Sequence, residues 1–449
     1  MKPANRRMPS QREHLLRIAI ASAVLSWAYG IGWAQTLVEK GPERQPTVFP
    51  DRIILTWNAD PARTQAVSWR TDQSVRSGAA ELVGSDGAIK WVQYENRTRE
   101  ALMDPASIRR VPAASQDHAE TRSRYHQAVF DALTPGREYF YRVGDGEHWS
   151  EWLSFRTAAG GREPFRFLYF GDAQFGLRSL WPRALRAALR AAPDARFLVH
   201  AGDLVDYGDS DVEWGQWFDS GGWILASVPS IPSPGNHEHT KLSVKPEVWR
   251  LSPFWRLQFT LPEHAPQAVA EQAYYVDYQG TRIISLNSVH QIEDQAVWLK
   301  DVLRHNPNRW TIVTFHYPLY DAGKREASLP AMNLARKLWG PIFIEHAVDL
   351  VLTGHWHEYF RGPVPPKSKG DGTVGPMWVT STAGGCCLPT QLYQVVSVNG
   401  DRLDFDATTV DGRAYDGFTL VKGRGRRDTV RERRPPGASI VGFRETPDR

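Results

Sequence analysis

VDLVLTGHWH, residues 348–357, is an apolar run that ends in a glycine and two histidines. A short apolar run bounded by a turn signal predicts a buried strand, and the residues after it then fall in a loop. Here that loop holds His355 and His357, directly after Gly354. Imidazoles at such a position are candidate metal ligands.

The same arrangement recurs at four earlier places. Each has an apolar run leading into a loop that begins with a residue type able to bind a metal. The blocks are FGDAQFG with Asp172, AGDLVDYG with Asp203, PGNHE with Asn236 and His237, and TFHYP with His316. In layered α/β folds, loops beyond the carboxyl ends of strands bring residues that are distant in sequence into one site. One block alone is weak evidence, but five in order predict a metal site.

The ligand types indicate the chemistry of this site. Hard oxygen ligands and imidazoles together suit metals such as Zn, Mn, Fe or Co. A carboxylate can bridge two ions, and two ions about 3.5 to 4 Å apart can clamp a phosphate and lower the pKa of a bridging water. The blocks therefore predict two divalent or mixed-valence ions (Fe, Zn or Mn) and hydrolysis of a phosphate ester by a metal-bound hydroxide.

The organisation of the chain predicts two domains after an N-terminal leader. Residues 51–158 contain short strands separated by turns, which is typical of a β-sandwich of the immunoglobulin or fibronectin class. Over residues 164–422, apolar runs alternate with helical patterns such as 180–192, which predicts a layered α/β domain. Residues 35–50 are a linker, and the basic residues 423–449 are expected to form a disordered tail.

Residues 1–34 have the pattern of a secretory signal peptide. Arginines precede an apolar run from Ile18 to Ala34, and Gly32 and Ala34 are small residues placed as a cleavage site requires. The protein is therefore expected to be secreted or periplasmic. The apolar run is short for a membrane span, so an uncleaved N-terminal anchor is the alternative, and no other segment is expected to span a membrane.

Composition limits the other functions. The 449 residues carry a formal net charge of only +4, so no nucleic-acid partner is expected. The expected partner is a small phosphorylated substrate. The two cysteines, Cys386 and Cys387, are adjacent, which excludes a fold held together by a disulfide framework. They are expected to be small core or loop residues.

The five blocks together resemble the calcineurin-like metallophosphoesterases. More narrowly, residues 50–420 resemble the purple acid phosphatases, in segments such as LTPGREYFYRVG (133–144) and FHYPLY (315–320). The resemblance implies a fibronectin type III-like sandwich, with Trp69 in its core and Tyr139 at a tyrosine corner. It also implies a following four-layer α/β sandwich of two mixed sheets flanked by helices, and an acid phosphatase-like hydrolase of phosphomonoesters.

The resemblance also implies a role for each block residue. The metal ligands would be Asp172 and His357 for the first ion, Asn236, His316 and His355 for the second, and Asp203 as the bridge between them. His237 would be the catalytic residue beside the phosphate, where it stabilises developing charge or protonates the leaving oxygen. Glu238 is expected to orient the His237 imidazole, because the second ring nitrogen usually needs a partner.

Departures from the purple pattern leave three roles open. Asp206 stands three residues after Asp203, where purple enzymes have a tyrosine ligand of ferric iron, and Tyr207 follows it as a candidate ligand. Gln174 stands where purple members have glycine and many other metallophosphoesterases have a histidine ligand. Its amide oxygen is a candidate ligand of the first ion, against a hydrogen-bonding role in the loop. Arg325 is a candidate phosphate contact, where plant enzymes have histidines.

Two alternative functions remain. A phosphodiesterase or nucleotidase could use the same core, because substrate range depends on the surrounding loops. A surface binding protein with a vestigial metal site is the alternative from another class. The intact ligand set argues against the second alternative, since a decayed site is expected to lose ligands.

Overall fold

The computed structural model describes residues 44–85, 107–244, 247–320, 329–363, 373–384, 391–423 and 428–433, with short pieces at 93–94, 97–98 and 435. These residues belong to one compact unit that begins at Gly41. The predicted signal peptide, Arg325, Cys386 and Cys387 lie outside the described residues, so the predictions about them stay predictions. No helix within the described ranges is both long and apolar enough to cross a membrane.

Two four-stranded sheets make up the N-terminal region. Their strand orders are β1-β2-β8-β7 and β10-β9-β3-β6. The strands are β1 (Asp51–Thr56), β2 (Gln65–Asp72), β3 (Ala79–Gly84), β6 (Arg109–Pro112), β7 (Ala114–His118), β8 (Ser123–Phe130), β9 (Glu138–Gly144) and β10 (Leu153–Arg156), and a separate small pair is formed by β4 (Gln93–Tyr94) and β5 (Arg97–Thr98). Trp69 is buried in the core that the two four-stranded sheets share, as predicted. The hydroxyl of Tyr139 accepts the N–H of Thr134 at 2.9 Å, the kind of contact that a tyrosine corner makes.

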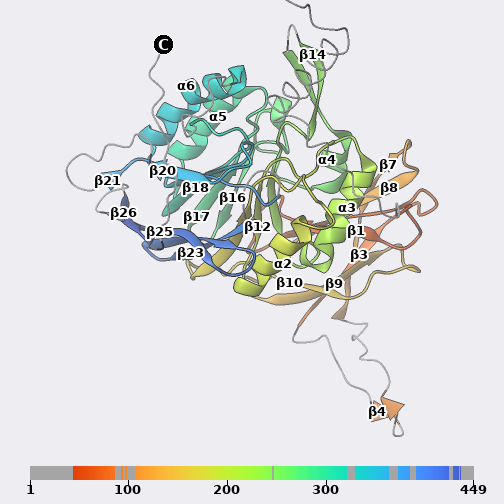
Figure 1. The fold of residues 1–449 in the computed structure, drawn as a ribbon. Coiled ribbons are helices and arrows are strands. Elements are labelled where there is room, and N and C mark those ends of the chain that lie inside the picture. Colours follow the sequence, from red (N-terminus) through yellow and green to blue (C-terminus); the bar gives the residue numbers. More distant parts are fainter. Residues whose placement is uncertain are drawn as a thin grey trace, which may run out of the picture. The chain divides into compact units, whose positions relative to one another are not determined.

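A sheet of eight strands and a sheet of six strands, called the two large sheets, form the framework of the following region (Figure 1). Their orders are β13-β12-β11-β23-β24-β25-β26-β21 and β16-β17-β18-β19-β22-β20. The strands are β11 (Phe165–Phe170), β12 (Leu198–Ala201), β13 (Ser230–Ser233), β16 (Tyr274–Tyr278), β17 (Thr281–Ser285), β18 (Trp310–Thr314), β19 (Leu350–Thr353), β20 (Phe360–Pro363), β21 (Thr373–Val374), β22 (Met377–Thr380), β23 (Leu392–Asn399), β24 (Arg402–Thr409), β25 (Ala414–Lys422) and β26 (Asp428–Glu432). Both sheets combine parallel and antiparallel pairs, which confirms the prediction of mixed sheets.

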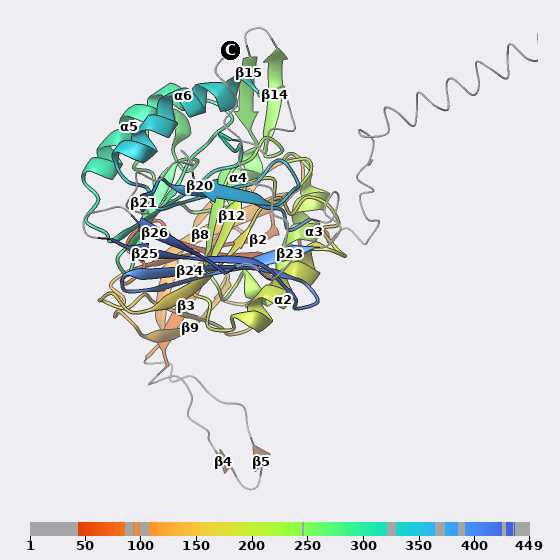
Figure 2. The ribbon, with the colours of Figure 1, turned by 60° about the vertical axis from the view of Figure 1, so that its left-hand side comes forward.

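The helices bury apolar side chains in the cores that the sheets form. They are α2 (Trp181–Ala191), α3 (Asp211–Gly221), α4 (Pro253–Gln258), α5 (Ile292–Arg304) and α6 (Pro330–Glu345). In β18, Ile312 faces the core between the sheets, whereas its neighbour Val313 packs against α5 and α6, as the period of two in a strand requires. Helices α5 and α6 lie side by side in both ribbon views (Figures 1 and 2).

Three elements around the site do not follow from the sequence pattern. Helix α3 is buried on several sides, so it lacks the one-sided apolar stripe of a surface helix. The short helix α4 and the hairpin of β14 (His239–Val244) and β15 (Glu247–Leu251) follow it. Figure 2 shows this hairpin standing apart from the two large sheets.

The C-terminal boundary corrects the sequence prediction. A disordered tail is predicted from residue 423, yet 428–432 form β26, which pairs antiparallel with β25. Val430 packs against the main core, and Glu432 accepts a hydrogen bond from the buried guanidinium of Arg361 at 2.6 Å. The prediction is wrong for this stretch because it relied on the many basic residues, whereas the strand is held by one apolar contact and by one ion pair to a buried arginine.

The N-terminal sheets and the larger sheets share a continuous core. Trp57, directly after β1, lies with its ring centroid 5.6 Å from that of Tyr278. Leu55 donates its N–H to the carbonyl of Leu225 at 3.0 Å, and the hydroxyl of Thr56 donates to the carbonyl of Thr260 at 2.7 Å. The sandwich is therefore fixed against the region that carries the metal-ligand blocks.

Candidate metal centre

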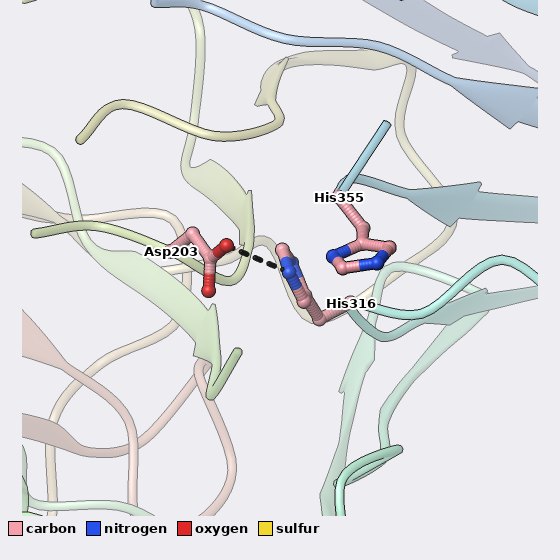
Figure 3. A group of neighbouring side chains, drawn as sticks. All are labelled: Asp203, His316 and His355. Atoms are coloured by element: carbon pink, nitrogen blue, oxygen red, sulfur yellow. Dashed lines mark ion pairs between the residues drawn. The ribbon is translucent and has the colours of Figure 1, made fainter. Parts of the chain in front are cut away.

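The five blocks converge at one end of the two large sheets. Asp172 and Asp203 follow β11 and β12, which are parallel neighbours, and Asn236 follows the next strand, β13. His316 and His355 follow β18 and β19, which are parallel neighbours in the other sheet. Because carboxyl ends of parallel strands meet at one edge, both sheets contribute to the same site. Figure 3 shows Asp203, His316 and His355 facing one another.

The ligand atoms form two groups that share one carboxylate. Asp203, His316 and His355 form one group, and Asp172, Asp203 and His357 form the other; within each, the candidate atoms lie within 4.8 Å of one another. Oδ2 of Asp203 is 2.8 Å from Nε2 of His316, and Oδ2 of Asp172 is 2.9 Å from Nε2 of His357. The arrangement suits two ions with Asp203 between them.

Asn236 joins the second group through its amide oxygen. Oδ1 of Asn236 lies 3.0 Å from Nε2 of His316, the nitrogen that also faces Asp203. The other ring nitrogen, Nδ1, donates to the carbonyl of Ala201 at 2.9 Å, which orients the imidazole. The structure thus brings together the six residues that the resemblance implies as ligands.

Three of these residues have a left-handed backbone conformation, which sets the direction of their side chains. The φ angles of Asp203, His355 and His357 are 52°, 77° and 51°. Such conformations cost on the order of 1–3 kcal/mol for residues other than glycine and cluster at functional sites. Hydrogen bonds to the ligand carboxylates hold this backbone: His355 donates its N–H to Oδ1 of Asp172 at 2.7 Å, and His237 donates its N–H to Oδ1 of Asp203 at 3.0 Å.

Two glycines are needed because the loops touch the carboxylates. A Cβ on Gly235 would overlap Oδ1 of Asp203, and a Cβ on Gly354 would overlap Oδ1 of Asp172. Any side chain at these positions therefore forces a ligand to move. The glycines serve the close approach of backbone to ligand rather than the turn alone.

Burial and mutual charge shift the ionisation of the cluster. Burial alone would lower the pKa of His316, but the Asp203 carboxylate outweighs it and raises that pKa to about 9. Burial and the neighbouring His316 lower the pKa of His355 to about 3. Burial raises the pKa of Asp203, yet His316 and His237 hold it well below its ordinary value. Buried carboxylates and imidazoles packed this closely are typical of metal sites.

Gln174 contributes a buried amide oxygen beside the first group. Its side chain is 2% exposed, and its Nε2 lies 3.4 Å from Nε2 of His357. Its Oε1 has no hydrogen-bond partner in the described part of the chain. A buried acceptor is rarely left without a partner, so this oxygen is available as a candidate metal ligand.

Tyr207 is placed differently. Its side chain is 64% exposed, whereas the ligand carboxylates are buried. Its backbone N–H donates to Oε2 of Glu213 at 2.9 Å, which fixes the main chain rather than the phenol. The geometry therefore lends no support to Tyr207 as a metal ligand.

His237 lies at the edge of the cluster, and its partner differs from the expected one. Its Nδ1 lies 2.5 Å from the carbonyl oxygen of Asp206 and 3.3 Å from Oδ1 of the same residue. Glu238 instead accepts the N–H groups of Asp203 (2.9 Å), Leu204 (2.7 Å) and Gly235 (2.7 Å). The expectation for Glu238 is wrong because this side chain turns inward, where it satisfies buried amides of two ligand loops.

Two other residues near the site have structural partners. Glu213 on α3 is buried and accepts the N–H groups of Asp206 and Tyr207; no motif in the sequence points to it. His239 is buried, with Nδ1 2.7 Å from the carbonyl of Gly235. Burial lowers the pKa of His239 to about 3, so it is a neutral core residue.

Comparisons with protein families match both regions of the chain. Residues 165–359 match the family described as calcineurin-like phosphoesterase. Residues 50–157 match the family described as purple acid phosphatase, N-terminal domain. The two matches meet close to the junction between the N-terminal sheets and β11.

Relatives and solved structures agree with these families. Acid phosphatase type 7 of Mus musculus is 26% identical over 383 residues, covering 77% of this chain and 80% of the relative. Phosphoenolpyruvate phosphatase of Allium cepa is 25% identical, covering 70% and 69%. The purple acid phosphatase PPD1 from yellow lupin (Lupinus luteus) seeds has a TM-score of 0.66 at 16% identity, covering 83% of this chain and 74% of that one. A structure of PhoD has a TM-score of 0.60 at 10% identity, covering 90% and 95%.

The fold and the five-loop site define a metal-dependent phosphoesterase. Its homologues are acid phosphatases and purple acid phosphatases. The chain contains a calcineurin-like phosphoesterase domain preceded by a purple acid phosphatase N-terminal domain, which confirms the resemblance seen in the sequence.

Proposed function

We propose that this chain is an acid phosphatase-like hydrolase of phosphomonoesters that works with two metal ions. The observation that carries the proposal is the pair of ligand groups joined at Asp203. When bound, two such ions polarise a phosphoryl oxygen and activate a water for in-line attack on phosphorus. Asp172 and His357 would hold the first ion together with Gln174, whose buried Oε1 would supply a further oxygen. Asn236, His316 and His355 would hold the second ion, and Asp203 would serve both.

His237 acts on the leaving group. A carbonyl oxygen only accepts hydrogen bonds, so Nδ1 of His237 carries the proton in its contact with Asp206. Nε2 is then the nitrogen directed to the site, 3.9 Å from Oδ2 of Asp203. The His237 side chain is 32% exposed, in contrast to the buried Asp203. It is thus placed to stabilise charge on the phosphate or to protonate the leaving oxygen, as general acid catalysis requires.

This chain has Asp206 at the position where purple acid phosphatases have a tyrosine ligand. The Asp206 carboxylate lies 3.3 Å from Nδ1 of His237, and the next residue, Tyr207, is exposed. We therefore expect ions that need no phenolate, such as Zn, Mn or ferrous Fe. An absorption spectrum tests this point, because a visible charge-transfer band would restore a ferric–tyrosinate site.

Metal analysis combined with two substrates tests the function. Two ions per chain and faster hydrolysis of p-nitrophenyl phosphate than of its bis-ester are the expected result. Preference for the bis-ester would favour the phosphodiesterase alternative. Fewer than two ions together with no turnover of either ester would favour a binding protein with a vestigial site.

Export is proposed from the sequence of the leader alone. Cleavage after Ala34 is the expected processing. Mass spectrometry of the mature N-terminus tests it, since an intact leader on membrane-bound protein would support the anchor instead.

A further inference from the structure

We propose that the N-terminal sandwich positions the catalytic histidine, through Asp211 and Glu213 at the start of α3. The proposal rests on the role of His237 in the proposed function. It makes Glu213 a positioning residue and gives the sandwich a part in catalysis. Three consecutive sets of contacts carry it: sandwich to α3, α3 to the Asp206 loop, and that loop to His237.

The first set ties two sandwich arginines to the first residue of α3. Nη1 of Arg52 donates to Oδ1 of Asp211 at 2.7 Å, and its Nη2 donates to the Asp211 carbonyl at 2.9 Å. Nη1 of Arg70 donates to Oδ2 of Asp211 at 3.2 Å, while its Nε and Nη2 bind Asp51. The Arg70 side chain is fully buried and the Arg52 side chain is 4% exposed. Buried charge pairs of this geometry hold one fixed arrangement, because breaking them leaves a buried charge unpaired.

The backbone of the sandwich is distorted at this contact. The β1–β2 register shifts between Asp51 and Ile54, and Arg52 between them has a φ of 50°. A bulge redirects a side chain, and a left-handed arginine is strained. Here the redirected side chain is that of Arg52, which binds Asp211.

The contact with α3 depends on these charges more than on close packing. A cavity of about 320 Å³ lies against Arg52, Asp211 and Gly215, so apolar side chains do not fill this part of the junction. Elsewhere the same two regions are joined by other contacts, including the hydroxyl of Tyr141, which donates to the carbonyl of Ala226. The ion pairs therefore hold the first residue of α3, while the rest of the interface keeps the regions together.

The second set ties α3 to the loop after β12. Ser210 caps the helix by accepting the N–H of Glu213. The buried carboxylate of Glu213 accepts two backbone N–H groups through Oε2, from Asp206 at 2.8 Å and from Tyr207 at 2.9 Å. The next helix residue, Trp214, donates its indole N–H to the carbonyl of Gly208 at 2.7 Å. The start of α3 thus holds three consecutive residues of this loop, 206–208.

The third set ties the loop to His237. The Asp206 carbonyl binds Nδ1 of the imidazole, and the N–H of Gly208 donates to the His237 carbonyl at 2.8 Å. A Cβ on Gly208 would come within 2.8 Å of that carbonyl oxygen, so the two segments are in direct contact. The loop consequently fixes both the backbone and the ring of His237, and its own position depends on Glu213.

The test compares Glu213→Ala and Asp211→Asn with Tyr141→Phe in the metal-loaded full chain. Tyr141→Phe is the matched control, because it removes a contact between the same regions away from α3. Turnover is measured with aryl phosphates of graded leaving-group pKa, alongside metal content and thermal stability. Glu213→Ala is expected to lower kcat about 10- to 100-fold, with KM and metal content unchanged. The loss should be largest for poor leaving groups, which need the proton most.

The remaining variants complete the comparison. Glu213→Gln keeps an acceptor oxygen and should retain most of the wild-type activity. If Glu213→Ala does not fold, Glu213→Gln and Asp211→Asn still test the inference. Asp211→Asn should lower kcat in the same leaving-group-dependent way, and its effect should not add to that of Glu213→Ala. Tyr141→Phe should lose stability and keep kcat.

Two results would overturn the inference. One is a folded Glu213→Ala variant whose kcat either equals that of the wild type or falls by the same factor for all leaving groups. The other is an Asp211→Asn that behaves like Tyr141→Phe. His237→Ala separates this failure from that of the proposed function: wild-type activity in His237→Ala refutes the role of the histidine itself.

Discussion

Replacing His126 by glutamine should make the protein resist acid better than the wild type does. His126 is buried in the N-terminal sandwich, where its Nε2 and Nδ1 lie 2.8 Å from the hydroxyls of Thr71 and Ser115 and its ring stacks on Trp69. Burial, assisted by the charge of Arg124, lowers the pKa of His126 from 6.5 to about 4, while Asp117 and Asp145 oppose the shift only weakly.

The size of the effect follows from linkage. Between pH 4 and 6.5 the unfolded chain binds a proton on His126 and the folded chain does not, so stability falls as the pH falls. A shift of this size corresponds to about 3 kcal/mol, fully present above pH 6.5 and lost by about pH 4. Glutamine can bind the same two hydroxyls and does not titrate.

Urea unfolding of both proteins from pH 4 to 7.5 measures this contribution. Other groups titrate over the same range, so the difference between the two proteins is the informative quantity. The wild type should lose about 3 kcal/mol relative to His126→Gln across the interval. Parallel stability curves for the two proteins would refute the reasoning.

Three further perturbations have defined outcomes. Gly354→Ala places a Cβ against Oδ1 of Asp172, so metal affinity should fall about 10- to 100-fold in titration calorimetry while the far-ultraviolet circular dichroism stays unchanged. Asp203→Asn weakens both ligand groups at once and should abolish phosphatase turnover; full activity with both ions still bound contradicts the proposed mechanism. Asp416→Ala removes the buried carboxylate that binds Arg361 and leaves the half-exposed Glu432 as its carboxylate partner, so the free energy of unfolding should fall by about 1.5–3 kcal/mol, and a denaturation midpoint equal to that of the wild type speaks against it.

The ligand set could be predicted because each ligand directly follows a strand that its own apolar neighbours announce. Asp203 and His316 come from different sheets, yet both lie at strand ends, where the topology of layered α/β folds brings such residues together. Only local sequence was needed for each of them.

The supports of the site could not be predicted in the same way. Glu213 reaches Asp206 from a helix whose buried faces give no clear amphipathic pattern, and nothing local marks it as a hydrogen-bond acceptor. Glu238 stands beside His237 in the sequence, but its carboxylate turns toward amides that the fold brings close. Strand β26 was not predicted because it is stabilised by pairing with β25, which its own sequence does not indicate. Each of these depends on contacts that exist only after the sheets have assembled.

In the proposed two-metal mechanism, the place of Asp203 in both candidate ligand groups has a consequence for the order of events during biosynthesis. Both ligand groups use this one carboxylate, yet His355 and His357 lie more than 150 residues further along the chain. Neither ion can have its full set of ligands until strand β19 has been synthesised and paired with β18. Such distant contacts form late in folding. In that mechanism, complete metal loading therefore requires the finished pairing of β18 and β19.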